Sequence, residues 1–201
     1  MVKTQHAIDT IYSRISSADV ERVPLVRVAG NDERRSASMI DDPVTAAVQA
    51  LVEPLEFPPL SAATVPGDRV AIAVDHDVPR AAAIVRGVVE ALHGAGIDDD
   101  GIAIVTTDAE FGRQCRAELG NEAASAIQSV THDPDDEKNL CLVAVRKRRE
   151  PLRVNRTIYD ADVVLPIGCS QLDGRGAFDG LFPWFAGAES DHVTRSGELS
   201  P

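Results

Sequence analysis

The sequence Val70-Ala-Ile-Ala-Val74 is followed directly by Asp75-His-Asp-Val-Pro-Arg80 and then by a segment with helical periodicity. Five consecutive apolar residues bounded by polar ones are typical of a β-strand that is buried on both faces of a sheet. Over residues 80–93, apolar side chains recur at intervals of three and four residues, which predicts a helix. Gly94 and Gly96 follow where that helix should end. A strand followed by a helix is the first half of a β–α–β unit.

Two more apolar runs of the same kind occur later in the chain, at Ile102–Thr107 and Ala161–Ile167. Between them, residues 113–127 have a helical pattern, and shorter strands are predicted at residues 129–131 and 140–145. Strands that alternate with helices form parallel sheets with right-handed crossovers. We therefore expect an α/β fold, a Rossmann-like and mostly parallel sheet with helices on both faces. The three long apolar runs should be neighbouring parallel strands.

These elements lie in a domain that we expect to span residues 23–190. Residues 1–22 indicate a polar N-terminal arm with a short amphipathic helix, and residues 191–201 indicate a C-terminal tail. Alternating apolar and polar side chains at residues 24–29 predict a strand.

The proline positions predict where a helix begins and where the chain is extended before the first buried strand. Asp42 directly before Pro43 is typical of a helix N-cap followed by proline at the first helical position, and this helix should continue to Leu51. The proline-rich residues 53–67 should form an extended connection, because proline interrupts helical hydrogen bonding.

The charge balance excludes two classes of partner. The chain has 20 basic and 32 acidic residues, which gives a net charge of −12. Such a surface repels nucleic acid and anionic lipid, so we expect neither as a partner. No apolar run approaches the roughly 18–20 residues that a membrane span needs, and the first ten residues lack the apolar stretch of a signal peptide.

The cysteines predict no zinc site. Cys115, Cys141 and Cys169 lie far apart and form no Cys-x-x-Cys pair. An odd number of cysteines without a signal peptide is typical of free, buried thiols in a reducing cytoplasm, so we expect a cytoplasmic protein.

Three loops follow the predicted parallel strands, so they should meet at one edge of the sheet. Ligands of open α/β sheets bind at that edge, beyond the carboxyl ends of the strands. The three loops are Asp75–Arg80, Asp108–Gly112 and Gly168–Gly176. We expect a small anion or a nucleotide to be the partner at this edge.

The first of these loops permits three interpretations. The helix that follows it could hold an anion at its amino end, with Arg80 as a fork-shaped donor. Asp75 and Asp77 would oppose that anion unless a cation lies between them. Alternatively, Asp77 caps the helix and pairs with Arg80. His76 is a third candidate, either as a metal ligand or as a base beside two carboxylates.

Two further polar segments have alternative interpretations. His132 next to Asp133 is a weak candidate for a general base, but the same residues could form an Asx-type turn in which His132 bonds to the backbone. The basic run Arg146-Lys-Arg-Arg149 could contact phosphate or a partner, or form the solvated tip of a hairpin.

Four aromatic residues fall within a span of eight. An exposed apolar cluster usually marks an interface, so we expect them to dock on a second, C-terminal domain or to form a homo-oligomer. The alternative is that they complete the core of this domain. The residues are Phe178, Phe182, Trp184 and Phe185.

A set of short motifs shares its order and spacing with a known family over roughly residues 23–190. On these motifs the chain resembles the N-terminal domain of the nickel-pincer lactate racemase family. The motifs are Asp42-Pro43, Ala50-Leu51, Pro54, Pro58-Pro59-Leu60, Pro66-Gly67, Val70–Val74, Asp77-Val-Pro-Arg80, Gly96-Ile97, Leu119-Gly120, His132-Asp133, Val154-Asn155-Arg156, Ala161-Asp162 and Gly168.

The resemblance implies a Rossmann-like N-terminal domain followed by a second domain. It implies an isomerase of 2-hydroxy acids whose cofactor, a nickel held by a pyridinium-derived nucleotide, binds between the two domains. By this resemblance Asp77 and Arg80 contact the nucleotide, and His192 is a weak candidate for a nickel ligand.

The chain departs from the family at three functional positions. The family's Gly-Thr-His-Arg loop falls on Ala109–Gly112 and its Glu-Pro-His motif near Gln171–Asp173, so neither catalytic histidine is present. The lysine that carries the family's cofactor falls near Pro183, and no lysine follows Lys147. Racemisation needs a base on each face of the substrate carbon.

Three functions therefore remain open from the sequence. The chain could be a divergent lactate racemase-like isomerase, or a non-catalytic anion-binding, nucleotide-binding or interaction domain of the same fold. It could also be a different enzyme that uses a divalent metal at Asp75, His76, Asp77 and His132.

Overall fold

The structure is a computed structural model that describes residues 41–145, 151–168, 181 and 185–188. These residues belong to one compact unit, which begins at Ile40. The arm, strand and tail predicted at residues 1–22, 24–29 and 191–201 lie outside the described residues.

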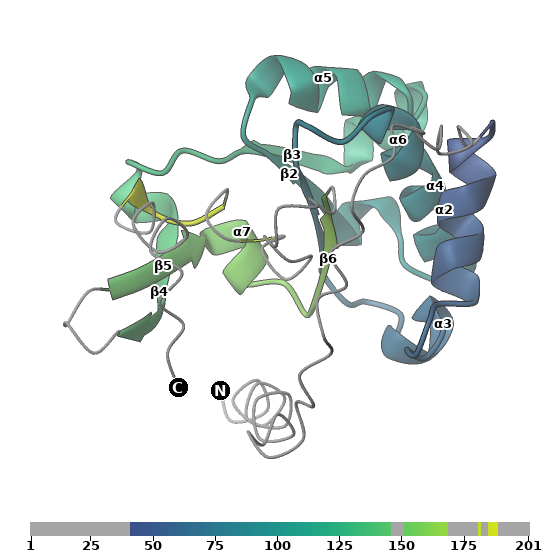
Figure 1. Ribbon diagram of the computed structural model, residues 1–201, viewed down its shortest axis with the longest axis horizontal. Helices are drawn as coiled ribbons and strands as arrows, with labels where there is room; N and C mark the ends of the chain where they lie inside the picture. The colour runs from purple at the N-terminus through teal and green to yellow at the C-terminus, as the bar shows by residue number, and fades with distance from the viewer. Residues whose placement is uncertain (1–40, 146–150, 169–180, 182–184, 189–201) are drawn as a thin grey trace, which may run out of the picture. The chain divides into compact units, whose positions relative to one another are not determined.

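A four-stranded parallel sheet forms the centre of this unit, in the order β3-β2-β1-β6 (Figure 1). Val70 of β1 lies between Ile102 of β2 and Val163 of β6, so the three apolar runs are neighbouring parallel strands, as the sequence predicts. The strands are β1 (Val70–Val74), β2 (Ile102–Thr106), β3 (Gln128–Thr131) and β6 (Val163–Ile167).

Helices cover the first face of the sheet. Large side chains from alternate positions of β1 and β2, such as Ile72 and Ile104, pack there against Val85 and Leu92 of α4. On the right of Figure 1, α2 lies beside α4. The helices of this layer are α2 (Pro43–Val52), α4 (Ala81–Gly94), α5 (Ala109–Ala117) and α6 (Asn121–Ala126).

The second face of the sheet carries smaller side chains and a different cover. Ala71, Ala73 and Val105 face Val154, Ile158 and Phe185, all of which are buried. The helix that the described residues place on this face is short, α7 (Arg156–Tyr159). It shares the face with a separate antiparallel ribbon of β4 (Leu140–Val145) and β5 (Pro151–Asn155). Helices are thus present on both faces, as predicted, but in unequal amounts.

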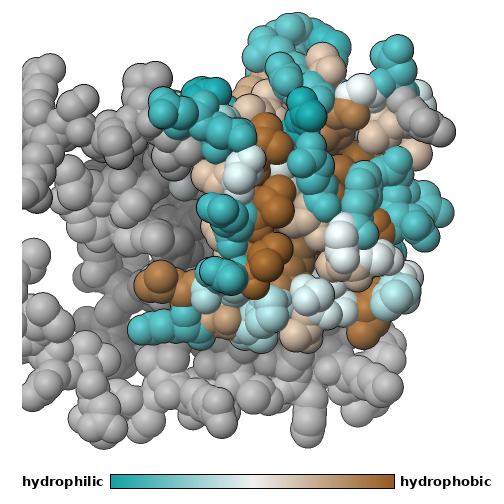
Figure 2. All heavy atoms as spheres, turned by 90° about the vertical axis from the view of Figure 1, so that its right-hand side faces the viewer, coloured by the Kyte–Doolittle hydropathy of each residue, from teal (hydrophilic) through white to brown (hydrophobic). Residues whose placement is uncertain are grey.

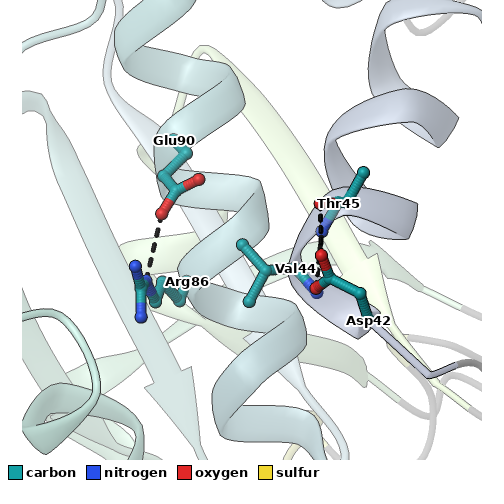
Figure 3. A network of polar contacts seen from close by, with 5 residues as sticks. All are labelled: Asp42, Val44, Thr45, Arg86 and Glu90. Atoms are coloured by element: carbon teal, nitrogen blue, oxygen red, sulfur yellow. Dashed lines mark hydrogen bonds and ion pairs between the residues drawn. The ribbon is translucent and has the colours of Figure 1, made fainter.

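Asp42 caps α2, as the sequence predicts. Its carboxylate accepts hydrogen bonds from the backbone N–H groups of Val44 and Thr45, at 3.1 and 3.2 Å (Figure 3). The hydrogen bond from the Thr45 hydroxyl is the largest reason why the pKa of Asp42 lies below its usual value. This cap fixes the start of the helix that packs on α4.

Two predictions about helices are wrong in detail. Residues 53–67 are not extended throughout, because α3 (Leu60–Ala63) forms one turn there, with Leu60 buried. The single helix predicted over residues 113–127 is two helices, α5 and α6, of which α5 begins at Ala109. Gly120 separates them at φ +82°, a left-handed backbone conformation that glycine adopts without strain. Two 3₁₀ turns, η1 (Asp99–Gly101) and η2 (Glu137–Asn139), precede β2 and β4.

None of the helices in the described ranges has the length and apolar character needed to cross a bilayer.

Candidate site at the carboxyl edge of the sheet

Two of the three predicted loops meet at one edge of the sheet. β1 runs into Asp75–Arg80 and then α4, and its neighbour β2 runs into Asp108 and then α5. The backbone N–H of Asp75 donates to the carbonyl of Ile167 at 2.9 Å, which ties the first loop to the end of β6. The third loop begins at Gly168, and its remaining residues lie outside the described part of the chain.

Asp75, His76 and Asp77 form a polar cluster directly after β1. Their potential ligand atoms all lie within 4.8 Å of one another. The imidazole lies between the two carboxylates, with Nδ1 3.2 Å from Asp75 Oδ1 and Nε2 3.3 Å from Asp77 Oδ1. Asp75 is buried, and the other two side chains are exposed. Two carboxylates and an imidazole are suitable ligands for a divalent cation.

Arg80 lies at the amino end of α4 in an unusual backbone conformation. Its φ is +57°, in the left-handed region, and it is the N-cap residue of a 14-residue helix. The Arg80 side chain makes no capping hydrogen bond to this helix, and the alternative in which Asp77 caps the helix and pairs with Arg80 stays a prediction. The Arg80 guanidinium is exposed and donates from Nη1 to the carbonyl of Asp41 at 3.3 Å.

His132, the weak candidate base, is a buried structural residue. Its Nε2 lies 3.0 Å from the carbonyl oxygen of Ala186, and its Nδ1 lies 3.3 Å from Asn155 Nδ2. The Asn155 amide oxygen accepts from the Thr157 N–H, so the amide nitrogen must face the imidazole. The ring is therefore neutral, with Nε2 protonated, and burial lowers its pKa. His132 is not part of the Asp75–Asp77 cluster.

The loop after β2 begins a helix instead of presenting a base. Asp108 is the N-cap of α5 and accepts from the N–H of Phe111 at 2.8 Å. The Phe111 side chain is half-buried and packs against the apolar core on the first face of the sheet. The remaining predicted site positions, Gln171–Asp173, Pro183 and His192, lie outside the described residues.

A cavity that the sequence did not predict lies at the opposite edge of the sheet. Its volume is about 350 Å³, and its walls include the first residues of β1 and β2. Charged residues of both signs surround it: Arg69, Asp100, Arg156 and Asp160. These four residues come from three separate segments, and of them Arg156 alone belongs to a motif quoted above.

The chain matches a known protein family and resembles a solved structure. The model of the lactate racemase N-terminal domain matches residues 17–179. The chain belongs to this family. No match was found among curated proteins. A similar solved structure is the lactate racemase apoprotein from Thermoanaerobacterium thermosaccharolyticum, with 18% identity and a TM-score of 0.43. The similarity covers 61% of this chain and 31% of that one, so the chain spans about a third of that protein's length.

The nickel-pincer nucleotide implied by the lactate racemase family fits this member only in part. Arg80 lies at the amino end of α4, and a guanidinium is a suitable donor to a phosphate group. Covalent attachment needs a lysine near the same edge. The lysine within the described residues is Lys138, whose carbonyl accepts from Arg156 beside the cavity at the opposite edge. The described residues therefore do not provide a lysine for the covalent bond at this edge.

Proposed function

We propose that this lactate racemase N-terminal domain binds a small anion, such as the phosphate of a nucleotide, at the carboxyl edge of β1 without racemising a 2-hydroxy acid. The observation that carries the proposal is the backbone of Arg80. A non-glycine residue at φ +57° costs on the order of 1 kcal/mol, and such strain gathers at ligand sites. Here it brings a guanidinium to the amino end of α4, whose N-cap residue makes no side-chain capping hydrogen bond.

The chemistry of this helix end favours a negative charge. The first N–H groups of a helix point outward and carry a partial positive charge. The first turn of α4 contains no acidic residue that would already neutralise it. A guanidinium can donate two parallel hydrogen bonds to a phosphate. The N–H groups of Ala81 and Ala83 donate to the carbonyls of Val78 and Arg80. The attraction for one anion therefore comes from the guanidinium and from the partial positive charge of the helix end.

The described residues support binding more than racemisation. A racemase needs two proton-transfer groups, and the position that aligns with one of them holds Phe111, packed on the core. His132 already uses both ring nitrogens in hydrogen bonds. We therefore assign no catalytic residue. The buried free thiol of Cys115 accords with the cytoplasmic location that we propose for this protein.

A divalent cation at Asp75, His76 and Asp77 is a second candidate function, supported by the close approach of their ligand atoms. Such a cation would also offset the two carboxylates that oppose an anion. The two functions can be separated, because anion binding through Arg80 alone should persist in a chelator.

Calorimetric titration of the purified chain with inorganic phosphate and with nicotinate mononucleotide tests the proposal. Arg80→Gly removes the guanidinium and suits the left-handed backbone, so this variant should stay folded and lose affinity at least roughly tenfold. Arg86→Ala is the matched control, because Arg86 lies on the same helix and pairs with Glu90 at 3.0 Å (Figure 3).

Equal affinities of the Arg80→Gly variant and the native chain would overturn the assignment of Arg80. Affinity that disappears in a chelator and returns with added Mg²⁺, Mn²⁺ or Ni²⁺ would favour the cation site instead. Asp75→Asn should then abolish the metal-dependent part.

A further inference from the structure

The surfaces predicted from the sequence to meet a partner fall largely outside the described residues. Of the aromatic cluster, Phe185 is fully buried in the core of this chain. The other three aromatic residues and the basic run at residues 146–149 lie outside the described part. Figure 2 looks onto the side of α2 and shows apolar side chains between polar ones. The edge of the sheet at the amino ends of its strands is different in character, because it contains a cavity lined by charged residues.

This amino-edge cavity, the one described above beside the first residues of β1 and β2, has the size of a small ligand site. Its volume is about 350 Å³. Ligand pockets span about 300–1,000 Å³, so a cavity at the lower end of that range suits a small molecule. The function proposed above does not use it, because the Asp75–Arg80 loop lies at the opposite edge of the sheet.

The lining of the amino-edge cavity combines buried apolar residues with exposed charged ones. The first two residues of β1 and of β2 are almost completely buried, and they give the cavity an apolar part. Gln128 and Asn139 add side-chain amides. The charged side chains are all exposed: Arg69, Asp100, Arg156 and Asp160. Two positive and two negative charges cancel, so the cavity has no overall preference for an anion or for a cation.

Both arginines are held in place through one nitrogen only. Arg69 Nε lies 3.6 Å from Asp162 Oδ2, and Arg156 Nε donates to the carbonyl of Lys138 at 3.1 Å. Among the described residues, neither guanidinium makes a further hydrogen bond or ion pair through its two terminal nitrogens. Each guanidinium is therefore oriented by the protein and can still donate two hydrogen bonds to a ligand.

The two carboxylates at the cavity do not pair with these arginines. Asp160 lies four residues after Arg156, at the end of α7, and Asp100 lies in the turn before β2. In the part of the chain that the structure describes, neither carboxylate lies within ion-pair distance of an arginine. Opposite charges that line one cavity without pairing leave room for a ligand that carries both charges.

We propose that the amino-edge cavity binds a small zwitterion of the class of a free amino acid. A guanidinium donates to the carboxylate of the ligand, and Asp100 or Asp160 accepts from its ammonium group. The apolar lining contacts its aliphatic part. An anion alone would meet two carboxylates of like charge, and a cation alone would meet two guanidiniums, so the cavity disfavours each.

Titration of the full 201-residue chain with L-valine, followed by heteronuclear NMR, tests the proposal. The backbone signals of Gly101 and Thr157 and the side-chain amide signals of Gln128 and Asn139 should shift and saturate. Isovalerate lacks the ammonium group of valine and isobutylamine lacks its carboxylate, so each should bind at least about threefold more weakly. Equal affinities of the three compounds would overturn the proposal. So would the absence of a saturating shift with L-valine, glycine and L-glutamine alike.

Two variants with matched controls test the assigned residues. Arg69→Gln and Asp160→Asn each remove one charge from an exposed side chain, so both variants should stay folded, which circular dichroism checks. The affinity for L-valine should fall at least about threefold in each. Arg113→Gln and Asp98→Asn remove the same charges from exposed residues outside the cavity and should leave the affinity unchanged. Unchanged affinity in both cavity variants, or an equal loss in the controls, would overturn the proposal.

Discussion

The Nδ1 atom of His132 accepts a hydrogen bond from Asn155 Nδ2 at 3.3 Å, between two side chains that are both buried. The pair joins the end of β3 to the start of α7, and the other ring nitrogen of His132 reaches Ala186 in the C-terminal segment. Both residues belong to motifs on which the family resemblance rests. In this protein they hold three segments of the fold together.

This contact predicts how stability depends on pH. Burial lowers the pKa of His132 in the folded state, so the unfolded chain binds more protons near the usual histidine pKa of about 6.5. The free energy of unfolding should therefore fall as the pH drops through that value toward the lower folded pKa. Urea unfolding at a series of pH values measures this change in the free energy of unfolding.

Asn155→Asp provides the matched variant for that experiment. Aspartate can still cap α7 by accepting from the Thr157 N–H, but it offers His132 an acceptor in place of a donor. The pKa of His132 should then rise, and the loss of stability on acidification should shrink or reverse. Identical pH profiles for the two proteins would contradict the neutral assignment of His132.

Gly87 predicts a large difference between two glycine-to-alanine substitutions in α4. A Cβ at Gly87 would lie 2.4 Å from the carbonyl oxygen of Val44 and 2.8 Å from Ala47 Cβ, so α2 would have to move. Gly87→Ala should destabilise the protein by about 1–3 kcal/mol, despite the better helix propensity of alanine. Gly94→Ala meets no atom within 4 Å and should be neutral or slightly stabilising. Thermal melts of both variants and of the native protein measure this difference in stability.

Cys115 should be chemically inert in the native protein. Burial raises its thiol pKa to about 11, so almost no thiolate exists at neutral pH. Iodoacetamide should therefore label Cys115 only after denaturation, and peptide mass spectrometry identifies the labelled site. Rapid labelling of Cys115 in folded protein would show that α5 opens readily.

The purified chain should carry no covalent nucleotide. It has no lysine after Lys147, and the described Lys138 lies by the opposite edge of the sheet. Intact-mass measurement after co-expression with the enzymes that make the cofactor tests this directly. A mass increase equal to a mononucleotide would show that another residue forms the bond.

The central sheet could be predicted because its signals are local. Each buried strand is a short apolar run, and helical periodicity follows β1 directly. The break before Gly120 is not predicted, because the apolar pattern continues across it. In the structure α5 ends at Ala117, and Gly120 precedes α6 at a positive φ. The α3 turn was missed because prolines on both sides suggested an extended chain.

The candidate site was less predictable, because it depends on backbone geometry and on contacts between distant segments. The loop at Asp75–Arg80 was found from its position after a buried strand. The conformation of Arg80 has no sequence signature, since left-handed residues are usually glycine or asparagine. His132 is adjacent in sequence to Asp133, which suggested a base, but its partners come from residues 155 and 186.

The cover on the second face of the sheet has a consequence for biosynthesis. Ala71, Ala73 and Val105 are closed off by Phe185, which the ribosome adds more than a hundred residues after β1. The helices of the first face are complete much earlier. The core on the first face can therefore form while the second face, which carries Ala71 and Ala73, still contacts solvent. A nascent chain that stalls before Phe185 would therefore expose this face, and we expect it to become a target for chaperones.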